Sequence, residues 1–455
     1  MSSFPKQILP ALEKIFGTTA LLTDPAECWT YGYDNSRRQG LPDAVVFASN
    51  AEQICATVKL CNQYQVPLTA RGRGTGTPGG AVPLQGGVVL SCERMQKIIN
   101  IDPDNRLMVV EPGVLNQSVQ EAAAKIGFFW PPDPSSLAFC TVGGNLAYNS
   151  AGPRAVKYGT PRENTLGLKA VIGTGEIIHT GTYTTKGVVG YDLTRLLIGS
   201  EGTLAIITEA TLKLTPLPET KQTLRAIYND IHAATRAVAK IMAQSITPCA
   251  LEFLDGAAIE LVREQGVVLP ATAKALLIIE NDGLLTNIAA ATEKIITAAT
   301  NEGLIEIITA ESEQLWRARK ALSPALRNIA PNKINEDVVV PVSRLPDLIM
   351  GLEQLSARYQ IKIVNFGHAG NGNIHVNLLT DSLNPSERQH ADRCLSEVFN
   401  LVLSLGGTLS GEHGVGIDKR DFIDRELDPV SIQLMKQIKK VFDPNGILNP
   451  EKIFK

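Results

Sequence analysis

The chain has 455 residues, with 44% apolar and 20% charged side chains, a composition typical of a soluble globular protein long enough for two or three domains. Its formal net charge of −3 argues against a broad nucleic-acid-binding surface, because such a surface requires an excess of basic side chains. No signal-peptide core opens the chain and no apolar run of about 18 residues occurs, so we expect a cytoplasmic protein without a membrane span.

Helical periodicity over residues 5–17 opens the chain, and residues 44–48 form the apolar run of a predicted strand. Asn50, followed by Gln53 three residues on, predicts the start of a helix. A second strand is predicted over residues 66–70. This strand–helix–strand unit leads directly into a glycine-rich loop.

The glycine-rich loop runs from Arg71 to Ala81, and five of its eleven residues are glycine. Three of these glycines fit the G-x-G-x-x-G pattern of a Rossmann turn, which requires a helix directly after them. Pro83, Gly86 and Gly87 occur there instead, before a predicted strand over residues 88–91, so a helix is excluded. The loop therefore joins two strands, and we predict that its backbone amides bind a phosphate or pyrophosphate. An ordinary glycine-rich surface loop is the alternative.

Two further stretches of small residues follow, Cys140–Gly152 and Gly199–Thr208, and a rigid turn cluster, Pro131–Ser136, precedes the first of them. We expect all of them to be loops. Three separate small-residue loops in the first half of the chain indicate a large flat ligand that is held from several sides.

With these motifs the sequence resembles the vanillyl-alcohol-oxidase-type flavoproteins, in the branch of D-lactate dehydrogenases, glycolate oxidase subunits and D-2-hydroxyglutarate dehydrogenases. The matching stretches are Arg71–Ala81, Thr141–Gly159, Gly190–Leu193, Gly199–Thr208, His368–Asn377, Gly411–Gly416 and Phe442–Pro450. The resemblance implies an α+β protein with a PCMH-type FAD-binding domain over residues 1–218 and a ferredoxin-like α+β cap, or substrate, domain with a metal site over 219–420. A C-terminal helical segment, 421–455, would return to the FAD domain.

The same resemblance assigns residues to FAD. Those for the pyrophosphate are Arg71, Gly72, Arg73, Gly74, Thr75, Gly76, Gly79 and Gly80. Those along the isoalloxazine are Pro132, Asp133, Ser135, Thr141, Gly143, Gly144, Asn145, Asn149, Ala151 and Gly152. Gly202, Ile206 and Ile207 complete the set, and Ile206 would contact the adenosine side.

The flavin is expected to be non-covalent. Some relatives attach FAD to a histidine, but the N-terminal half of this chain has only His179, which lies in a predicted strand over residues 176–180. One departure from the family pattern is Thr184–Gly190, where relatives usually carry an Asn-Val-Ala-Gly run.

From about Glu219 strands alternate with helices, as in a sheet layered with helices. Strands are predicted over 223–227, 248–254, 274–280 and 304–309, and helices near 230–243 and 286–301. A last helix is expected over about 429–442.

Two of the six histidines lie on either side of Asn371-Gly372, the favoured pair for a two-residue type I′ hairpin turn. A turn there would place His375 directly opposite His368, with both imidazoles on one face, where they could share one metal ion. Asn377, two residues on, shares that face.

Glu412 and His413 lie between glycines, which let a carboxylate and an imidazole approach a site closely. Two histidines and one glutamate leave coordination positions open, as in a catalytic metal site. The resemblance makes His368, His375 and Glu412 the ligands and His413 the general base. A solvated loop pair is the alternative for Glu412 and His413.

A carboxylate anchor is expected on the helical stretch Glu313–Ile329. At about 100° per residue Arg319 falls inside the apolar stripe, where its guanidinium suits a substrate carboxylate. An internal salt bridge is the alternative. Lys333 is a second candidate.

These features predict oxidation of a D-2-hydroxy acid to the 2-oxo acid. A divalent metal, for which we expect zinc, stabilises the alkoxide, His413 accepts the hydroxyl proton, and the hydride passes to flavin N5. The seven cysteines form no C-x-x-C motif, so neither an iron–sulfur cluster nor a zinc knuckle is expected. Electrons must then leave to a separate acceptor, such as an electron-transfer flavoprotein or a quinone-linked subunit. We also consider a homodimer.

Three rival functions share parts of this pattern. A transferase of the same fold, similar to alkyl-glycerone-phosphate synthase, would lack the two histidines and the glutamate. A carbohydrate oxidase would carry covalent flavin. A non-catalytic flavin subunit of a larger oxidase would not turn over alone.

Overall fold

The computed structural model describes residues 4–381 and 384–454, which form two compact units. The first unit comprises residues up to 151, residues 159–217 and the chain from Glu412 to the end; the second comprises 152–158 and 218–411. The C-terminal segment thus joins the first unit from residue 412 rather than 421. The short excursion 152–158 belongs to the second unit because its helix, α6 (Ala155–Tyr158), packs on strand β13 of that unit.

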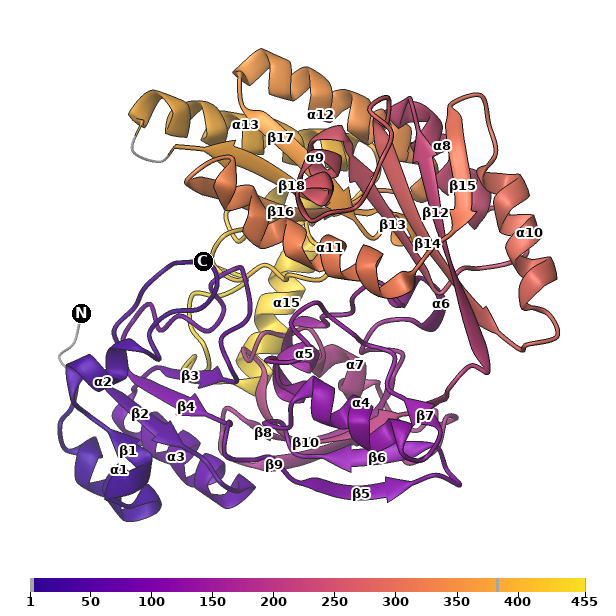
Figure 1. Ribbon diagram of the computed structural model, residues 1–455. Coiled ribbons are helices and arrows are strands. Elements are labelled where there is room, and N and C mark those ends of the chain that lie inside the picture. Colours follow the sequence, from indigo (N-terminus) through magenta and orange to yellow (C-terminus); the bar gives the residue numbers. More distant parts are fainter. Residues whose placement is uncertain (1–3, 382–383, 455) are drawn as a thin grey trace. The chain divides into compact units, whose positions relative to one another are not determined.

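A four-stranded sheet opens the first unit, in the order β1-β2-β4-β3 (Figure 1). Its strands are β1 (Leu21–Leu22), β2 (Ala44–Phe47), β3 (Leu68–Arg71) and β4 (Val88–Ser91). Helices α1 (Ile8–Phe16) and α3 (Ala51–Tyr64) share its core. The predicted start of α3 is confirmed, since the Asn50 side chain accepts a hydrogen bond from the Gln53 N–H at 2.9 Å.

Strands β2 and β3 both run parallel to β4, which lies between them. Parallel neighbours are usually joined through a helix. Here the connection from β3 to β4 is residues 72–87, all of which are described and none of which is helical. The exclusion of a Rossmann turn is therefore confirmed.

The second sheet of this unit is antiparallel, in the order β5-β6-β10-β8-β9. Its strands are β5 (Ile98–Asp102), β6 (Leu107–Val110), β8 (Thr165–Ile172), β9 (Ile177–Gly181) and β10 (Ala205–Lys213). Its core includes Trp130, which is fully buried and donates its indole N–H to the Asn164 carbonyl at 2.9 Å. The predicted C-terminal helix, α15 (Pro429–Phe442), packs Ile438 and Phe442 against this core.

Shorter elements complete the first unit. They are α2 (Pro25–Trp29), α4 (Asn116–Ala124), β7 (Phe128–Phe129), α5 (Val142–Tyr148), α7 (Leu193–Leu197), β11 (Thr215–Pro216) and α14 (Ile423–Glu426). No helix among the described residues has the length and apolarity to cross a membrane.

The second unit is built on a seven-stranded antiparallel sheet, in the order β15-β12-β14-β13-β17-β18-β16 (Figure 1). Its strands are β12 (Thr220–Tyr228), β13 (Ala250–Asp255), β14 (Ala275–Gly283), β15 (Leu304–Thr309), β16 (Asn332–Val339), β17 (Lys362–Gly367) and β18 (Asn373–Thr380). All four strands predicted between residues 223 and 309 are present.

Apart from α6, the α-helices described in the second unit form two groups. α9 (Gly256–Glu264) and α11 (Ser312–Ala325) share one core with the sheet, and their buried partners include Leu254 and Phe366. The other group is α8 (Ile231–Met242), α10 (Ile288–Ala299), α12 (Leu345–Tyr359) and α13 (Pro385–Ser404). This is a layered α+β unit, as predicted.

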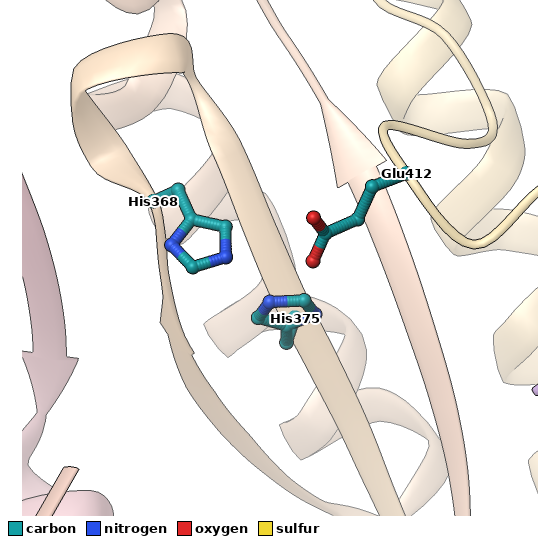
Figure 2. A group of neighbouring side chains, drawn as sticks. All are labelled: His368, His375 and Glu412. Atoms are coloured by element: carbon teal, nitrogen blue, oxygen red, sulfur yellow. The ribbon is translucent and has the colours of Figure 1, made fainter. Parts of the chain in front are cut away.

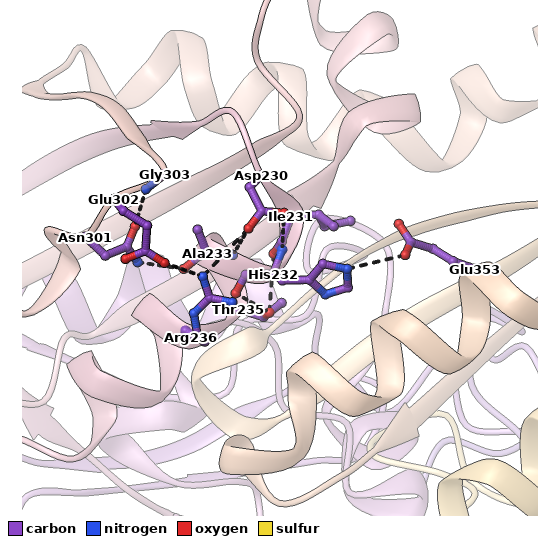
Figure 3. Close-up of polar contacts among 10 residues, drawn as sticks. All are labelled: Asp230, Ile231, His232, Ala233, Thr235, Arg236, Asn301, Glu302, Gly303 and Glu353. Carbon is purple, nitrogen blue, oxygen red and sulfur yellow. Dashed lines mark hydrogen bonds and ion pairs between the residues drawn. The ribbon is translucent and has the colours of Figure 1, made fainter.

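A surface network ties α8 to its neighbours (Figure 3). Asp230 caps the helix by accepting a hydrogen bond from the Ala233 N–H at 2.9 Å. Arg236 contacts Glu302 at 2.5 Å, and His232 Nε2 lies 3.6 Å from a carboxylate oxygen of Glu353 on α12. These partners give His232 a structural role on the surface.

Candidate active site

The glycine-rich loop is packed so closely that side chains are excluded at several of its positions. A Cβ on Gly72 would overlap the Thr141 hydroxyl, and one on Gly80 would overlap the Tyr148 hydroxyl. Gly74 and Gly79 have φ angles of +65° and +81°, which disfavour any residue with a side chain. The glycines therefore let the loop lie flat on the segment that contains Thr141 and Tyr148.

Arg71 supports this loop from inside. Its side chain is buried, and Nη1 donates to the Tyr33 carbonyl at 2.7 Å. Burial lowers the pKa of Arg71, and the nearby Asp34 carboxylate opposes that shift. Arg73 is exposed instead, so it is the arginine of this loop that remains accessible to an anion.

The second small-residue stretch is not a loop throughout, which corrects the prediction. Residues Val142–Tyr148 form helix α5, because the Thr141 hydroxyl caps the helix by accepting from the Gly144 N–H at 3.3 Å. The helix ends at Asn149, which adopts the left-handed conformation with φ +58°. The cap and the left-handed asparagine outweigh the low helix propensity of Gly143 and Gly144.

Backbone hydrogen bonds bring the predicted stretches together. The N–H groups of Gly199 and Glu201 donate to the carbonyls of Leu146 and Ala147, each at 2.8 Å. The turn cluster joins them, since Asp133 N–H donates to the Ala151 carbonyl at 2.8 Å. The residues expected to hold FAD therefore converge in the first unit, apart from Gly152, which is assigned to the second.

Asn116 supports the same region and was not predicted. It is fully buried on α4, and its amide N–H groups donate to the Pro132 carbonyl and to Asn145 Oδ1, both at 3.0 Å. No sequence signal singles Asn116 out, because its burial appears only in the folded structure. Gly74, with φ +65°, and the half-buried residues on either side of Arg73 in the range 72–77 fit a bound pyrophosphate.

Glu201 was also missed, although its neighbour Gly202 was named. Its carboxylate is buried and accepts hydrogen bonds from the N–H groups of Val415 and Gly416, at 2.6 and 2.8 Å. Desolvation raises the pKa of Glu201 to about 7, against the lowering effect of those two bonds. One side chain thus holds the turn that follows His413.

In the second unit, the hairpin that carries the two histidines has a different register from the predicted one. His375 pairs with Phe366 rather than with His368, because a 3-10 turn, Ala369–Asn371, lengthens the connection. Gly372, with φ +72°, closes that turn. The register moves by two residues, so both histidines remain on the predicted face, with ring centroids 5.3 Å apart.

Three candidate metal ligands meet here (Figure 2). One ligand atom each from His368, His375 and Glu412 lies within 4.8 Å of the others. Glu412 is bonded to Gly411, the last residue of the second unit, whose N–H donates to the Asp337 carbonyl at 2.9 Å. Two imidazoles and one carboxylate suit a divalent ion such as zinc and leave coordination positions open.

Glu252 on β13 supports this site, and no sequence signal singled it out. Its carboxylate is 1% exposed; one oxygen lies 2.5 Å from His368 Nδ1, and the other accepts from Arg319 Nε at 2.7 Å. Desolvation would raise the pKa of Glu252, but its interactions with His368 and Arg319 outweigh that effect and lower the pKa to about 2. The carboxylate is therefore ionised.

Arg319 faces inward on α11, as predicted, whereas Arg317 and Lys320 are exposed. It makes the internal salt bridge that was the alternative to a substrate anchor, and its guanidinium lies 4.7 Å from the centre of the Phe366 ring. The bond to Glu252 uses only one of its five N–H donors.

The remaining predicted residues lie on strands beside the histidines. Asn377 is fully buried and donates to the carbonyls of Val364 and His375, both at 3.1 Å, while its Oδ1 has no hydrogen-bond partner among the described residues. The Lys333 ammonium donates to the Ser323 hydroxyl on α11 at 2.6 Å. His179, by contrast, is exposed on β9.

Comparison with known proteins matches both units. The family model "FAD binding domain" covers residues 42–181, and "FAD linked oxidases, C-terminal domain" covers residues 217–453.

Similar proteins have closely related lengths. Glycolate oxidase subunit GlcD from Bacillus subtilis is 41% identical, over 93% of this chain and 92% of its own. A D-lactate dehydrogenase from Anaerostipes hadrus is 35% identical, over 90% of this chain and 89% of its own. Among solved structures, p-cresol methylhydroxylase matches with a TM-score of 0.80 at 20% identity, over 98% of this chain and 96% of that chain, which shows a shared fold.

Proposed function

Because the chain belongs to the family of FAD-linked oxidases, in the branch of glycolate oxidase subunit GlcD and the D-lactate dehydrogenases, we propose that it oxidises a D-2-hydroxy acid to the 2-oxo acid. The candidate substrates are glycolate, D-lactate and D-2-hydroxyglutarate. The observation that carries the proposal is the cluster of His368, His375 and Glu412, backed by Arg319, since it pairs a candidate Lewis-acid site with a cation for a carboxylate.

The reaction removes a proton and a hydride from the substrate. When bound, FAD would supply the two-electron acceptor at the loops around Arg71–Gly80, Thr141–Ala151 and Gly202–Ile207. His368, His375 and Glu412 would hold a divalent ion, zinc in this proposal, whose charge stabilises the alkoxide as it forms. His413 accepts the hydroxyl proton as the general base.

The substrate carboxylate is bound by Arg319, whose terminal nitrogens can bind an anion while Nε stays on Glu252. Lys333 is the second cation for a carboxylate on a longer substrate. Asn377 is included as a polar group of the catalytic site, because its Oδ1 is buried and has no hydrogen-bond partner among the described residues.

The reduced flavin must pass its electrons to a separate acceptor. A relative named as an oxidase subunit supports an acceptor on a partner subunit, and an electron-transfer flavoprotein or a quinone-linked subunit has the required chemistry. A homodimer and a cytoplasmic location remain part of the proposal.

An anaerobic visible spectrum of the purified protein, recorded before and after each candidate acid, tests the function. We expect a flavin band that bleaches with one of glycolate, D-lactate or D-2-hydroxyglutarate. A flavin band that none of the three bleaches, in protein reconstituted with zinc, would contradict the proposed substrate class. Absence of a flavin band after reconstitution with FAD would contradict the assignment of the glycine-rich loop.

A further inference from the structure

Glu252 connects two groups that the proposed function treats separately. One carboxylate oxygen contacts His368 Nδ1 and the other accepts from Arg319 Nε. The side chain is 1% exposed and comes from the middle of the sheet, on β13. A buried carboxylate is costly unless charged or hydrogen-bonded groups surround it, and here both of its oxygens have such a partner.

The contact with His368 determines which ring nitrogen can bind a metal. An ionised carboxylate only accepts hydrogen bonds, so Nδ1 must carry the proton. A neutral imidazole then has its lone pair on Nε2. Figure 2 shows the His368 ring beside His375 and Glu412, and one ligand atom of each residue lies within 4.8 Å of the others, so Nε2 is the nitrogen through which His368 would bind a shared ion.

We propose that Glu252 is a positioning residue that holds His368 in the Nδ1–H tautomer for metal binding and holds Arg319 beside it for the substrate carboxylate. This inference rests on the proposed metal site. His368 and Arg319 contact the same carboxylate, so neither side chain can turn without breaking its bond to Glu252. The orientation of the metal ligand is therefore coupled to that of the anion-binding arginine.

The variant Glu252→Gln has a specific expected effect. Arg319 can only donate, so the amide oxygen of the new side chain must face it. The amide NH₂ then faces His368 Nδ1, which must accept, and the ring proton moves to Nε2. The tautomer is therefore inverted, and the lone pair needed for the metal is lost.

Glu280→Gln is the matched control. Glu280 lies on the neighbouring strand β14, opposite Ala250, and is 4% exposed. Its carboxylate accepts hydrogen bonds from the Ser312 hydroxyl and the Trp316 indole N–H, both at 3.1 Å. The control therefore removes a buried carboxylate from the same sheet but leaves the contact between Glu252 and His368 in place.

Two measurements test the inference. Competition of zinc with a chromophoric chelator should give about 10- to 100-fold weaker zinc binding for Glu252→Gln and wild-type binding for Glu280→Gln. Nitrogen-15 shifts of the histidine rings in metal-free protein, with His368 assigned through His368→Gln, should show Nδ1–H in the wild type and Nε2–H in Glu252→Gln.

Wild-type zinc affinity in Glu252→Gln, or an Nε2–H tautomer of His368 in the wild type, would overturn the inference. The tautomer measurement needs no metal, and its wild-type part does not depend on the folding of Glu252→Gln. If wild-type protein binds no zinc but shows the Nδ1–H tautomer, the metal proposal fails while the role of Glu252 in orienting His368 stands.

Discussion

Glu201 Oε1 accepts a hydrogen bond from the backbone N–H of Val415 at 2.6 Å, across 214 residues of sequence. The second oxygen bonds the next N–H, and Glu201 itself adopts a left-handed backbone conformation with φ +54°. A non-glycine residue rarely takes that conformation, so the contact has a conformational cost that the fold must offset. It fixes the turn that directly follows Glu412 and His413.

The first prediction is that Glu201→Gln loosens this turn. The amide NH₂ would face a backbone N–H, which leaves a buried donor without an acceptor at a cost of about 1–3 kcal/mol. Urea unfolding should show this loss, and protease cleavage within residues 412–416 should become faster. Glu209→Gln, on the half-buried part of β10, is the control. Unchanged cleavage in Glu201→Gln would show that the turn holds without the carboxylate.

The second prediction concerns pH. Desolvation raises the pKa of Glu201 from 4.5 to about 7, against the lowering effects of its two backbone hydrogen bonds and of Lys452 and Lys419. The Tyr148 phenol lies in the same buried region. A raised pKa favours the protonated form in the fold, so this stabilisation is complete below about pH 4.5 and is lost as pH rises through 7. Its size is on the order of 3 kcal/mol. Urea midpoints between pH 4.5 and 8 should fall more steeply for the wild type than for Glu201→Gln, and parallel curves would contradict the assignment.

The third prediction concerns the metal ligands. His375→Ala should remove bound metal and slow flavin reduction at least about 100-fold, because the alkoxide loses its stabilising charge. The flavin spectrum should persist, since the glycine-rich loop belongs to the other unit. His179→Ala, at an exposed position, serves as the control. Metal analysis measures the bound ion, and stopped-flow spectroscopy measures the rate of flavin reduction. Full metal content in His375→Ala would show that His375 is not a metal ligand.

The fourth prediction is that His413→Ala slows flavin reduction by about 10²- to 10⁴-fold while metal content stays the same, because a general base contributes to the rate and not to ion binding. The control is His390→Ala on α13. Reduction of His413→Ala at the wild-type rate would show that another group accepts the hydroxyl proton.

The fifth prediction separates the two arginines of α11. Arg319→Gln should raise KM about 10- to 100-fold, as expected for loss of a charged hydrogen bond to the substrate. Arg317→Gln should not, because Arg317 is exposed and pairs with Glu313 one turn away. Steady-state kinetics with the acid that bleaches the flavin would measure KM for both variants. If both variants keep the wild-type KM, Arg319 serves only as the structural partner of Glu252.

Local patterns in the sequence were sufficient for much of the fold. The Asn50 cap, the helix 429–442 and the strand 304–309 were predicted correctly, because periodicity, capping and turn chemistry depend on residues close together in the chain. The absence of a helix after the glycine-rich loop followed in the same way from Pro83 and the two glycines near it.

The same local information placed His368 and His375 on one face of a hairpin, because a strand alternates its side chains with a period of two. It did not give the register, since the 3-10 turn at Ala369–Asn371 depends on how the strand ends pack. It also treated Val142–Tyr148 as a loop, where Thr141 and Asn149 close a short helix.

The sequence by itself therefore determined three expectations. They are a large flat ligand with a phosphate, the position of His368 and His375 on one face of a hairpin, and the inward direction of Arg319 on α11. Only the tertiary structure revealed Glu252, which meets His368 and Arg319 from 116 and 67 residues away, and Glu201, which holds the turn after His413. The physical reason is that a buried carboxylate acquires its role from the donors that fold around it, and those donors come from distant strands and turns.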